Sequence, residues 1–156
     1  MIEVDIPGYT IFQFRHLVLD VNGTIARDGQ LIDGVGELLT ELRSQLDIHL
    51  VTADTFGTQE TLNKTLRLQA VRLRVQNQVK AKLDYIEGLG FDKVVAVGNG
   101  ANDAAMIEHA ALGIIIIGPE GAAVTSLLRA DIAVSDIRSA LELLIHPKRL
   151  VATLRR

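Results

Sequence analysis

The chain has 156 residues, of which 48% are hydrophobic and 22% charged. This length suits one domain, and this composition supports a folded core, which excludes general intrinsic disorder. Asp and Glu number 19 against 16 Lys and Arg, so the formal net charge is -3 and the basic excess typical of nucleic-acid binders is missing. The chain has no cysteine, which excludes disulfides, thiolate zinc sites and a cysteine nucleophile.

The first residues and the hydropathy pattern predict a cytoplasmic protein. Glu3 and Asp5 stand where a secretory signal carries positive charge. The longest apolar run, centred on residues 114–117, is far shorter than the roughly 20 residues that cross a bilayer. We therefore expect neither a membrane nor a nucleic acid among the partners.

Strand-like and helix-like patterns alternate along the chain. In chain order we predict a strand at 16–19, a hairpin at 24–32 that turns at Asp28 and Gly29, a helix at 35–46 capped by Asp33, a strand at 48–51, a weak helix at 58–68, an edge strand at 71–75, a helix at 79–89 closed by Gly90, a strand at 94–97, a helix at 102–111, a strand at 114–117, a helix at 124–128, a strand at 132–134 and a helix at 137–145 stopped by Pro147.

This alternation is typical of an α/β fold, a three-layer Rossmann-like arrangement with a mostly parallel sheet and helices on both faces. We expect one domain over residues 1–156, with residues 1–15 and the tail at 147–156 as accessories. For the tail, packing on a neighbouring molecule and packing on the sheet both stay open.

Polar residues follow three of the predicted strands. Asp20 ends the first strand, Thr52 ends the second, and the strand at 94–97 continues into a segment that contains Asn99 and Asp103. Because ligands of parallel sheets bind beyond the carboxyl ends of the strands, these groups should share one rim. Carboxylates can attack phosphorus or bind Mg2+, and hydroxyl, lysine and backbone N–H groups can bind phosphate oxygens, so the set favours phosphoryl transfer.

Four motifs in order resemble those of the haloacid dehalogenase (HAD) superfamily. They are DVNGT at 20–24, TAD at 52–54, a lysine at 80 or 82, and GNGANDAAM at 98–106. Within that superfamily the chain is similar to the phosphorylation domain of P-type cation ATPases and to the small soluble P-type ATPase-like phosphatases. The resemblance spans about residues 16–135.

The resemblance implies a role for each matched position. Asp20 matches the nucleophile that becomes an aspartyl phosphate and also binds Mg2+, and Asp103 matches the metal-binding aspartate. The remaining assignments are Gly23, Thr52, Ala53 and Lys82 (with Lys80 as the alternative lysine) for phosphate binding, and Asn22 and Asn99 as further metal-site residues.

Two asparagines depart from the family pattern. Asn22 stands where phosphatases of the family place an acid/base Asp, and Asn99 stands where an Asp is more usual. Because an amide carries no proton to a leaving alkoxide, we expect slow turnover through Asp20. The alternative is a non-catalytic HAD-like module that binds Mg2+ and phosphate, or a protein partner. A signalling receiver domain is disfavoured. The phosphate-accepting Asp of a receiver domain ends a middle strand, whereas Asp20 ends the first predicted strand of this chain.

The spacing also implies a capless member of the superfamily. Residues 24–32 leave room only for a hairpin flap, and residues 77–80 leave none for a second insertion. The resemblance then implies a phosphorylated small molecule or a phosphoprotein as substrate, and oligomerisation as a way to roof the open site.

Overall fold

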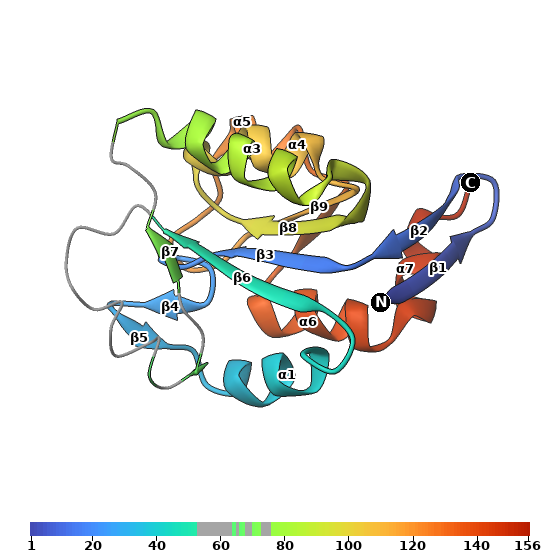
Figure 1. Cartoon of the computed structure of the whole chain (residues 1–156), viewed down its shortest axis with the longest axis horizontal. Helices are drawn as coiled ribbons and strands as arrows, with labels where there is room; N and C mark the ends of the chain where they lie inside the picture. The colour runs from blue at the N-terminus through green and yellow to red at the C-terminus, as the bar shows by residue number, and fades with distance from the viewer. Residues whose placement is uncertain (53–63, 65, 68–69, 73–75) are drawn as a thin grey trace.

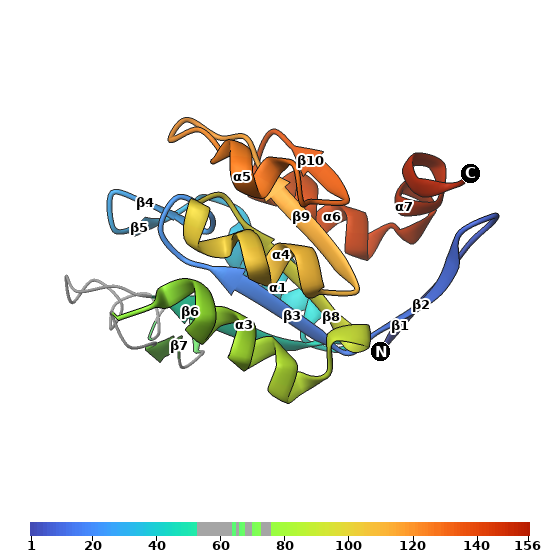
Figure 2. The same ribbon diagram turned by 90° about the horizontal axis from the view of Figure 1, so that it is seen from above.

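The computed structural model describes residues 1–52, 64, 66–67, 70–72 and 76–156. In these residues the central sheet has six parallel strands in the order β10-β9-β8-β3-β6-β7 (Figures 1 and 2). The strands are β3 (His16–Asp20), β6 (Asp47–Thr52), β7 (Ala70–Arg72), β8 (Val94–Gly98), β9 (Leu112–Ile116) and β10 (Ile132–Val134). The predicted parallel sheet is therefore confirmed, with β7 at one edge.

Helices cover both faces of this sheet (Figure 1). The helices of the described residues are α1 (Val35–Leu42), α3 (Gln78–Leu89), α4 (Ala104–His109), α5 (Val124–Leu127), α6 (Ile137–Ile145) and α7 (Pro147–Leu154), with 3-10 turns at Phe91–Lys93 and Ala101–Asp103. α1 packs beside α6 on one face, while α3, α4 and α5 lie on the other. This arrangement is the predicted three-layer α/β fold. Among the helices of the described residues, none combines the length and apolar character that a membrane span requires.

The central strand β3 shows why its apolar run is continuous. Leu17 and Leu19 are fully buried in the core under α1 and α6, whereas Val18 is fully buried in the core under α3 and α4. Successive side chains of a strand point to opposite faces, so a strand covered on both faces needs apolar residues at every position. Burial on both faces therefore explains why the continuous apolar run at 16–19 correctly predicts a strand.

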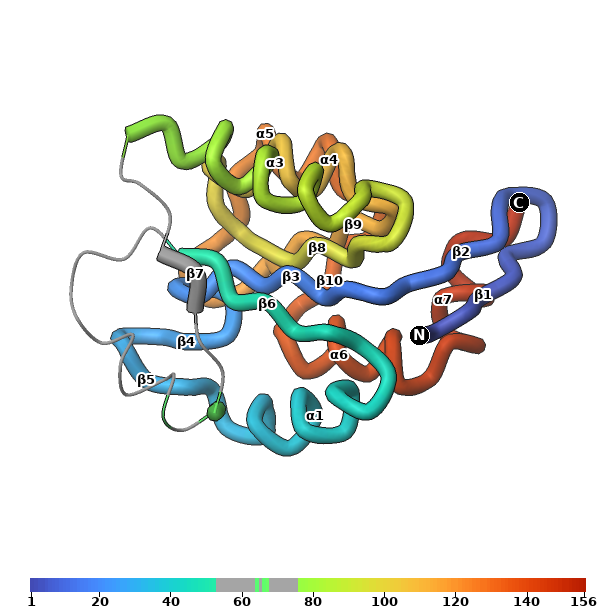
Figure 3. The backbone as a smooth tube through the Cα atoms, viewed as in Figure 1, coloured from blue at the N-terminus to red at the C-terminus, as the bar shows by residue number. Residues whose placement is uncertain are grey.

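The N-terminal segment and the C-terminal tail pack on each other. β1 (Ile2–Ile6) and β2 (Thr10–Phe14) form an antiparallel hairpin, and α7 lies against β1 at the same end of the molecule as both termini (Figures 1 and 3). Leu150 of α7 is fully buried in a core that includes Phe12 and Phe14. Neither packing considered for the tail, on a neighbouring molecule or on the central sheet, included this hairpin.

One local prediction, the N-cap of the first helix, is wrong. α1 is preceded by Gly34, whose φ of 82° turns the chain, and no side chain caps this helix, so Asp33 is not its N-cap. The helix predicted at 124–128 is confirmed as α5, in which Val124 and Leu128 are 66% and 81% exposed and Ser126 is buried. The predicted helix at 58–68 and the end of the predicted strand at 73–75 lie mainly outside the described residues.

The hairpin between β3 and α1 is present. β4 (Ala26–Arg27) pairs antiparallel with β5 (Gln30–Leu31). Asp28 and Gly29 both have a positive φ, 51° and 76°. Two-residue hairpin turns that match the twist of the strands require positive φ at both positions. This hairpin stands beside the carboxyl end of β3 (Figure 1), the end that carries the polar residues described next.

Candidate active site

Three neighbouring strands end in the polar residues that the sequence singles out. Asp20 is the last residue of β3 and is paired in register with Val51 of β6, so Thr52 ends β6 one residue further along. β8 ends at Gly98 on the other side of β3 and leads into the 3-10 turn that contains Asp103. Thr52 and Asp103 are both buried. The candidate site therefore surrounds the end of the central strand.

Lys82 links the two acids. Its Nζ donates to Asp20 Oδ1 at 2.6 Å and to Asp103 Oδ1 at 2.5 Å, and its side chain is fully buried. Lys82 faces the sheet because it lies one helical turn before the buried Ile86 in α3. Lys80 instead lies on the exposed side of α3, where it pairs with Asp84 at 2.6 Å. Of the two lysines considered, only Lys82 reaches the acids.

The backbone of the β8 loop fixes Asp103. Its Oδ2 accepts hydrogen bonds from the backbone N–H groups of Asn99, at 3.0 Å, and Gly100, at 2.9 Å. A Cβ at Gly98 would lie only 2.4 Å from the same oxygen. The glycine before Asn99 is thus required by the close approach of a carboxylate to the chain.

Thr24 is a site residue that sequence reasoning missed. Its hydroxyl is buried and lies 3.3 Å from Asp20 Oδ2 and 3.4 Å from Asn99 Oδ1, so it can donate to either oxygen. The only sequence signal was its place four residues after Asp20, within the DVNGT motif. Gly23, with a φ of 79°, makes the turn that brings Thr24 back.

The two asparagines take different places at the site. Asn99 lies against the turn at Gly23: a Cβ added at Gly23 would be 2.6 Å from Asn99 Nδ2. The same Cβ would be 2.7 Å from Oε2 of Glu120, which also contacts this turn. Asn22 is exposed, and its backbone forms a bridge with Ala26 of the flap. Glu120 was not predicted, and Ala53 lies outside the described residues.

Burial and charge shift the titration of the central pair. Burial raises the pKa of Asp20 to about 7, the nearby Asp103 carboxylate adds to the rise, and Lys82 opposes it. Burial works against the charged form of Lys82, but Asp20 and Asp103 together raise its pKa above the ordinary value. Lys82 therefore stays a cation, whereas its surroundings disfavour the charged form of Asp20 near neutral pH.

The donor set fits a divalent cation that prefers oxygen ligands. In the described part of the chain, two buried carboxylates share one ammonium group, which leaves a net negative charge for a cation to offset. No three His, Cys, Asp or Glu side chains are grouped there to enclose a metal. Mg2+ commonly takes one or two carboxylates and completes its shell with water and substrate phosphate. Asp20, Asp103 and the Asn22 carbonyl are the residues that would hold it.

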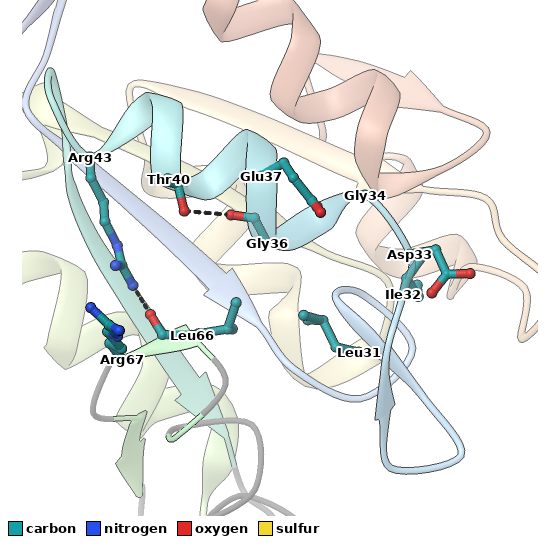
Figure 4. A pocket seen from close by; sticks show the side chains of 10 residues that line it. All are labelled: Leu31, Ile32, Asp33, Gly34, Gly36, Glu37, Thr40, Arg43, Leu66 and Arg67. Carbon is teal, nitrogen blue, oxygen red and sulfur yellow. Dashed lines mark hydrogen bonds between the residues drawn. The ribbon is translucent and has the colours of Figure 1, made fainter.

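A cavity of about 110 Å³ adjoins the site. It is lined by Gly23 and Thr24, by residues 118–120 and by residues 135–138. A larger cavity of about 810 Å³ lies between α1 and residues 66–67 (Figure 4), where Arg43 donates to the Leu66 carbonyl. Its lining contains neither Asp20 nor Lys82, so we place the chemistry by the buried charges and not by the larger volume.

The fold is that of the haloacid dehalogenase superfamily, as predicted. A putative HAD superfamily (subfamily III A) hydrolase from Legionella pneumophila superposes with a TM-score of 0.71 at 15% identity, over 90% of this chain and 87% of that one. The 3-deoxy-D-manno-octulosonate 8-phosphate phosphatase from Moraxella catarrhalis, solved with magnesium and phosphate ions and KDO, superposes with a TM-score of 0.67 at 19% identity, over 89% and 90%.

A comparison of sequences finds a relative of higher identity. This chain is 46% identical over 79 residues to the uncharacterized protein MJ0073 of Methanocaldococcus jannaschii, a match that covers 48% of this chain and 85% of that protein. The chain therefore belongs to the same family as MJ0073. No family model matches the sequence.

Proposed function

We propose that the chain is a Mg2+-dependent phosphohydrolase that acts through an aspartyl phosphate on Asp20. The observation that carries the proposal is Lys82, a fully buried cation within 2.6 Å of Asp20 and 2.5 Å of Asp103. Buried charges are costly to maintain, so a lysine and two acids buried together at a ligand-binding rim favour a catalytic role. The fold shared with a phosphatase solved with magnesium and phosphate supports the same chemistry.

The residues divide the reaction between them. A carboxylate oxygen of Asp20 attacks phosphorus, and the bond to the leaving oxygen breaks with its electron pair on the leaving group. Water then attacks the same phosphorus, which releases phosphate and restores the Asp20 carboxylate. Lys82 and the Thr52 hydroxyl would bind phosphoryl oxygens. Bound Mg2+ would offset the charge of the phosphoryl group.

Asn22 makes this a slow enzyme in our proposal. General acid–base assistance contributes roughly 10²–10⁴-fold to rates, and an amide cannot protonate a leaving alkoxide or activate water. We therefore expect a preference for acyl or aryl phosphates, whose leaving groups need no proton. The substrate we propose is a phosphorylated small molecule or a phosphoprotein in an open site, which a second copy of the chain would roof.

A phosphate-release assay with Mg2+ on acyl and aryl phosphates tests the proposal. Asp20→Asn keeps the shape of the side chain and should abolish activity, whereas Lys80→Ala, on the exposed side of α3, should leave it unchanged. Asn22→Asp should speed the release of phosphate from the phosphoenzyme in single-turnover measurements. Wild-type activity in a folded Asp20→Asn protein would reject Asp20 as the nucleophile.

A second candidate is a non-catalytic module that binds Mg2+ and phosphate. The observation that favours it is that both Asn22 and Asn99 replace acids of the family pattern. A fluoride complex that mimics phosphate should then raise the melting temperature only when Mg2+ is present, while no phosphate ester or acyl phosphate is turned over. Turnover that depends on Asp20 would reject this candidate.

A further inference from the structure

A second polar cluster lies at the opposite end of the β3–β6 strand pair. His16 begins β3 and is paired in register with Asp47, the first residue of β6; His49 follows two residues later. Residues two apart in a strand share a face, and directly paired residues of neighbouring strands do too. All three side chains therefore lie on one face of the sheet, the face covered by α3, from which Tyr85 reaches them.

Ring nitrogens of the two histidines meet in this cluster. His16 Nδ1 lies 3.2 Å from His49 Nε2, so one hydrogen is shared between two nitrogen lone pairs. The other nitrogen of His49, Nδ1, is 2.8 Å from the Tyr85 hydroxyl oxygen. Asp47 Oδ2 is 3.6 Å from His16 Nδ1. The reaction proposed above uses none of these groups.

We propose that His16 and His49 form a zinc-binding site, with Asp47 and water completing the shell of the metal ion. In tetrahedral zinc sites the Zn–N distance is about 2.0–2.1 Å, which places two ligand nitrogens about 3.3 Å apart. The 3.2 Å observed here already matches this separation, so the two nitrogens would keep their spacing while the rings rotate. The metal ion would displace the shared hydrogen and lie to one side of the line that joins the two nitrogens, so both rings would turn their lone pairs toward it.

The electrostatics of the pair suit a metal ligand. A histidine must be neutral to bind a metal. Burial lowers the pKa of His49, the neighbouring His16 lowers it further, and Asp47 opposes the shift. The shift favours the neutral ring that a metal requires, and the carboxylate of Asp47 would supply negative charge for a divalent cation.

Asp47 is the ligand that must move. No three acidic, histidine or cysteine side chains in the described ranges already converge on a metal position. The side chain of Asp47 is 78% exposed, against 18% for His16, so its carboxylate has room to turn toward the pair. Two preformed nitrogen ligands and one adjustable carboxylate give three protein ligands, and water takes the open position.

Tyr85 is a positioning residue in this proposal. Histidine ligands usually hydrogen-bond through their second nitrogen, which fixes the tautomer and the ring orientation, and loss of such a partner typically costs 10–100-fold in metal affinity. When His49 Nε2 binds the metal, Nδ1 carries the hydrogen and donates it to the Tyr85 oxygen. Tyr85→Phe removes this acceptor while it keeps the ring in the core.

Titration calorimetry with Zn2+ in excess Mg2+ tests the site. The wild-type chain should bind one Zn2+, and the folded variants His16→Ala and His49→Ala should lose this binding. His109→Ala is the matched control, because His109 is exposed on α4 and its Nδ1 donates to the Ala105 carbonyl of its own helix. Asp103→Asn should keep the binding, which separates this site from the one at Asp20. Tyr85→Phe should weaken binding about 10–100-fold and leave the visible spectrum of the Co2+-loaded protein four-coordinate.

Nitrogen NMR of the wild-type chain gives a readout that needs no variant. Zn2+ should shift the resonances of His16 Nδ1 and His49 Nε2 and leave those of His109 and His146 in place. Absence of a Zn2+-binding event in the wild-type protein, or binding that persists in folded His16→Ala and His49→Ala proteins, overturns the proposal. Binding lost in Asp103→Asn instead would assign the zinc to the phosphoryl site.

Discussion

The two ends of the β3–β6 strand pair hold polar groups in opposite ways. At the carboxyl end, Lys82 and Asp103 are fully buried and ionised groups meet at hydrogen-bond distance. At the amino end, His16 and His49 are only partly buried, and the lowered pKa of His49 favours an uncharged ring. One end thus maintains charge inside the protein, while the other avoids it.

This difference predicts at which end the loss of one side chain destabilises the protein more. A buried ion pair gains little net stability, but removal of one member leaves an uncompensated charge and is strongly destabilising. Neutral rings that share a hydrogen bond and remain partly hydrated carry no such penalty. Variants at the carboxyl end should therefore cost far more stability than matched variants at the amino end.

The largest effect is expected for Lys82→Met, which removes the ammonium group but keeps most of the side-chain volume. Two buried carboxylates are then left without their cation, and we expect a loss of about 3–5 kcal/mol in the free energy of unfolding without Mg2+. Urea denaturation measures this loss. Mg2+ should restore more stability to this variant than it adds to the wild type, because it offsets the same charges.

Lys80→Met is the control for the charge itself. Lys80 is exposed and pairs with Asp84 one turn along α3, an interaction of about 0.3–0.5 kcal/mol in such helical pairs. If Lys82→Met destabilises the chain no more than Lys80→Met does, the two acids are not held by Lys82 and the comparison between the two ends fails.

A smaller effect is expected for Gly98→Ala. The added Cβ would lie 2.4 Å from Asp103 Oδ2, so the carboxylate or the loop must shift, at a cost of about 1–3 kcal/mol. Gly88→Ala is the opposite case: Gly88 lies in α3 with nothing within 4 Å of the new Cβ, and alanine should stabilise the helix by about 0.5–1 kcal/mol. Thermal unfolding of the two variants measures both changes in stability. A Gly98→Ala protein that is stabilised, as Gly88→Ala should be, would contradict the close approach of Asp103 to Gly98.

The fold could be predicted because its signals are local. Buried strands are continuous apolar runs, as at 94–97, and Gly90 ends α3 with a positive φ of 89°. Which face of a short helix is buried depends instead on tertiary packing. Val124 and Leu128 have helical spacing, but α5 turns Ser126 inward because its hydroxyl donates to the Gly100 carbonyl at 2.7 Å.

The candidate site could be predicted in part, since the carboxyl ends of parallel strands must meet. This rule brings Asp20, Thr52 and the β8 loop together without knowledge of any contact. Thr24 was missed because its role depends on a turn that returns the chain to Asp20. The His16–His49 contact was missed as well: the two residues are 33 apart in sequence and lie on different strands, so no motif spacing indicates it.

The smallest effect concerns the pH dependence contributed by the amino end. Burial and His16 lower the pKa of His49 in the folded chain, so below the ordinary value near 6.5 the unfolded chain binds more protons. Wild-type stability should therefore decline through this contribution as the pH falls below 6.5, with metal removed by EDTA. His49→Gln should decline less than the wild type, and His109→Gln should follow the wild type. Because both variants retain Asp20, the titration of the carboxyl end cancels in the difference between them. A His49→Gln curve parallel to that of His109→Gln would show that the amino end carries no titration penalty.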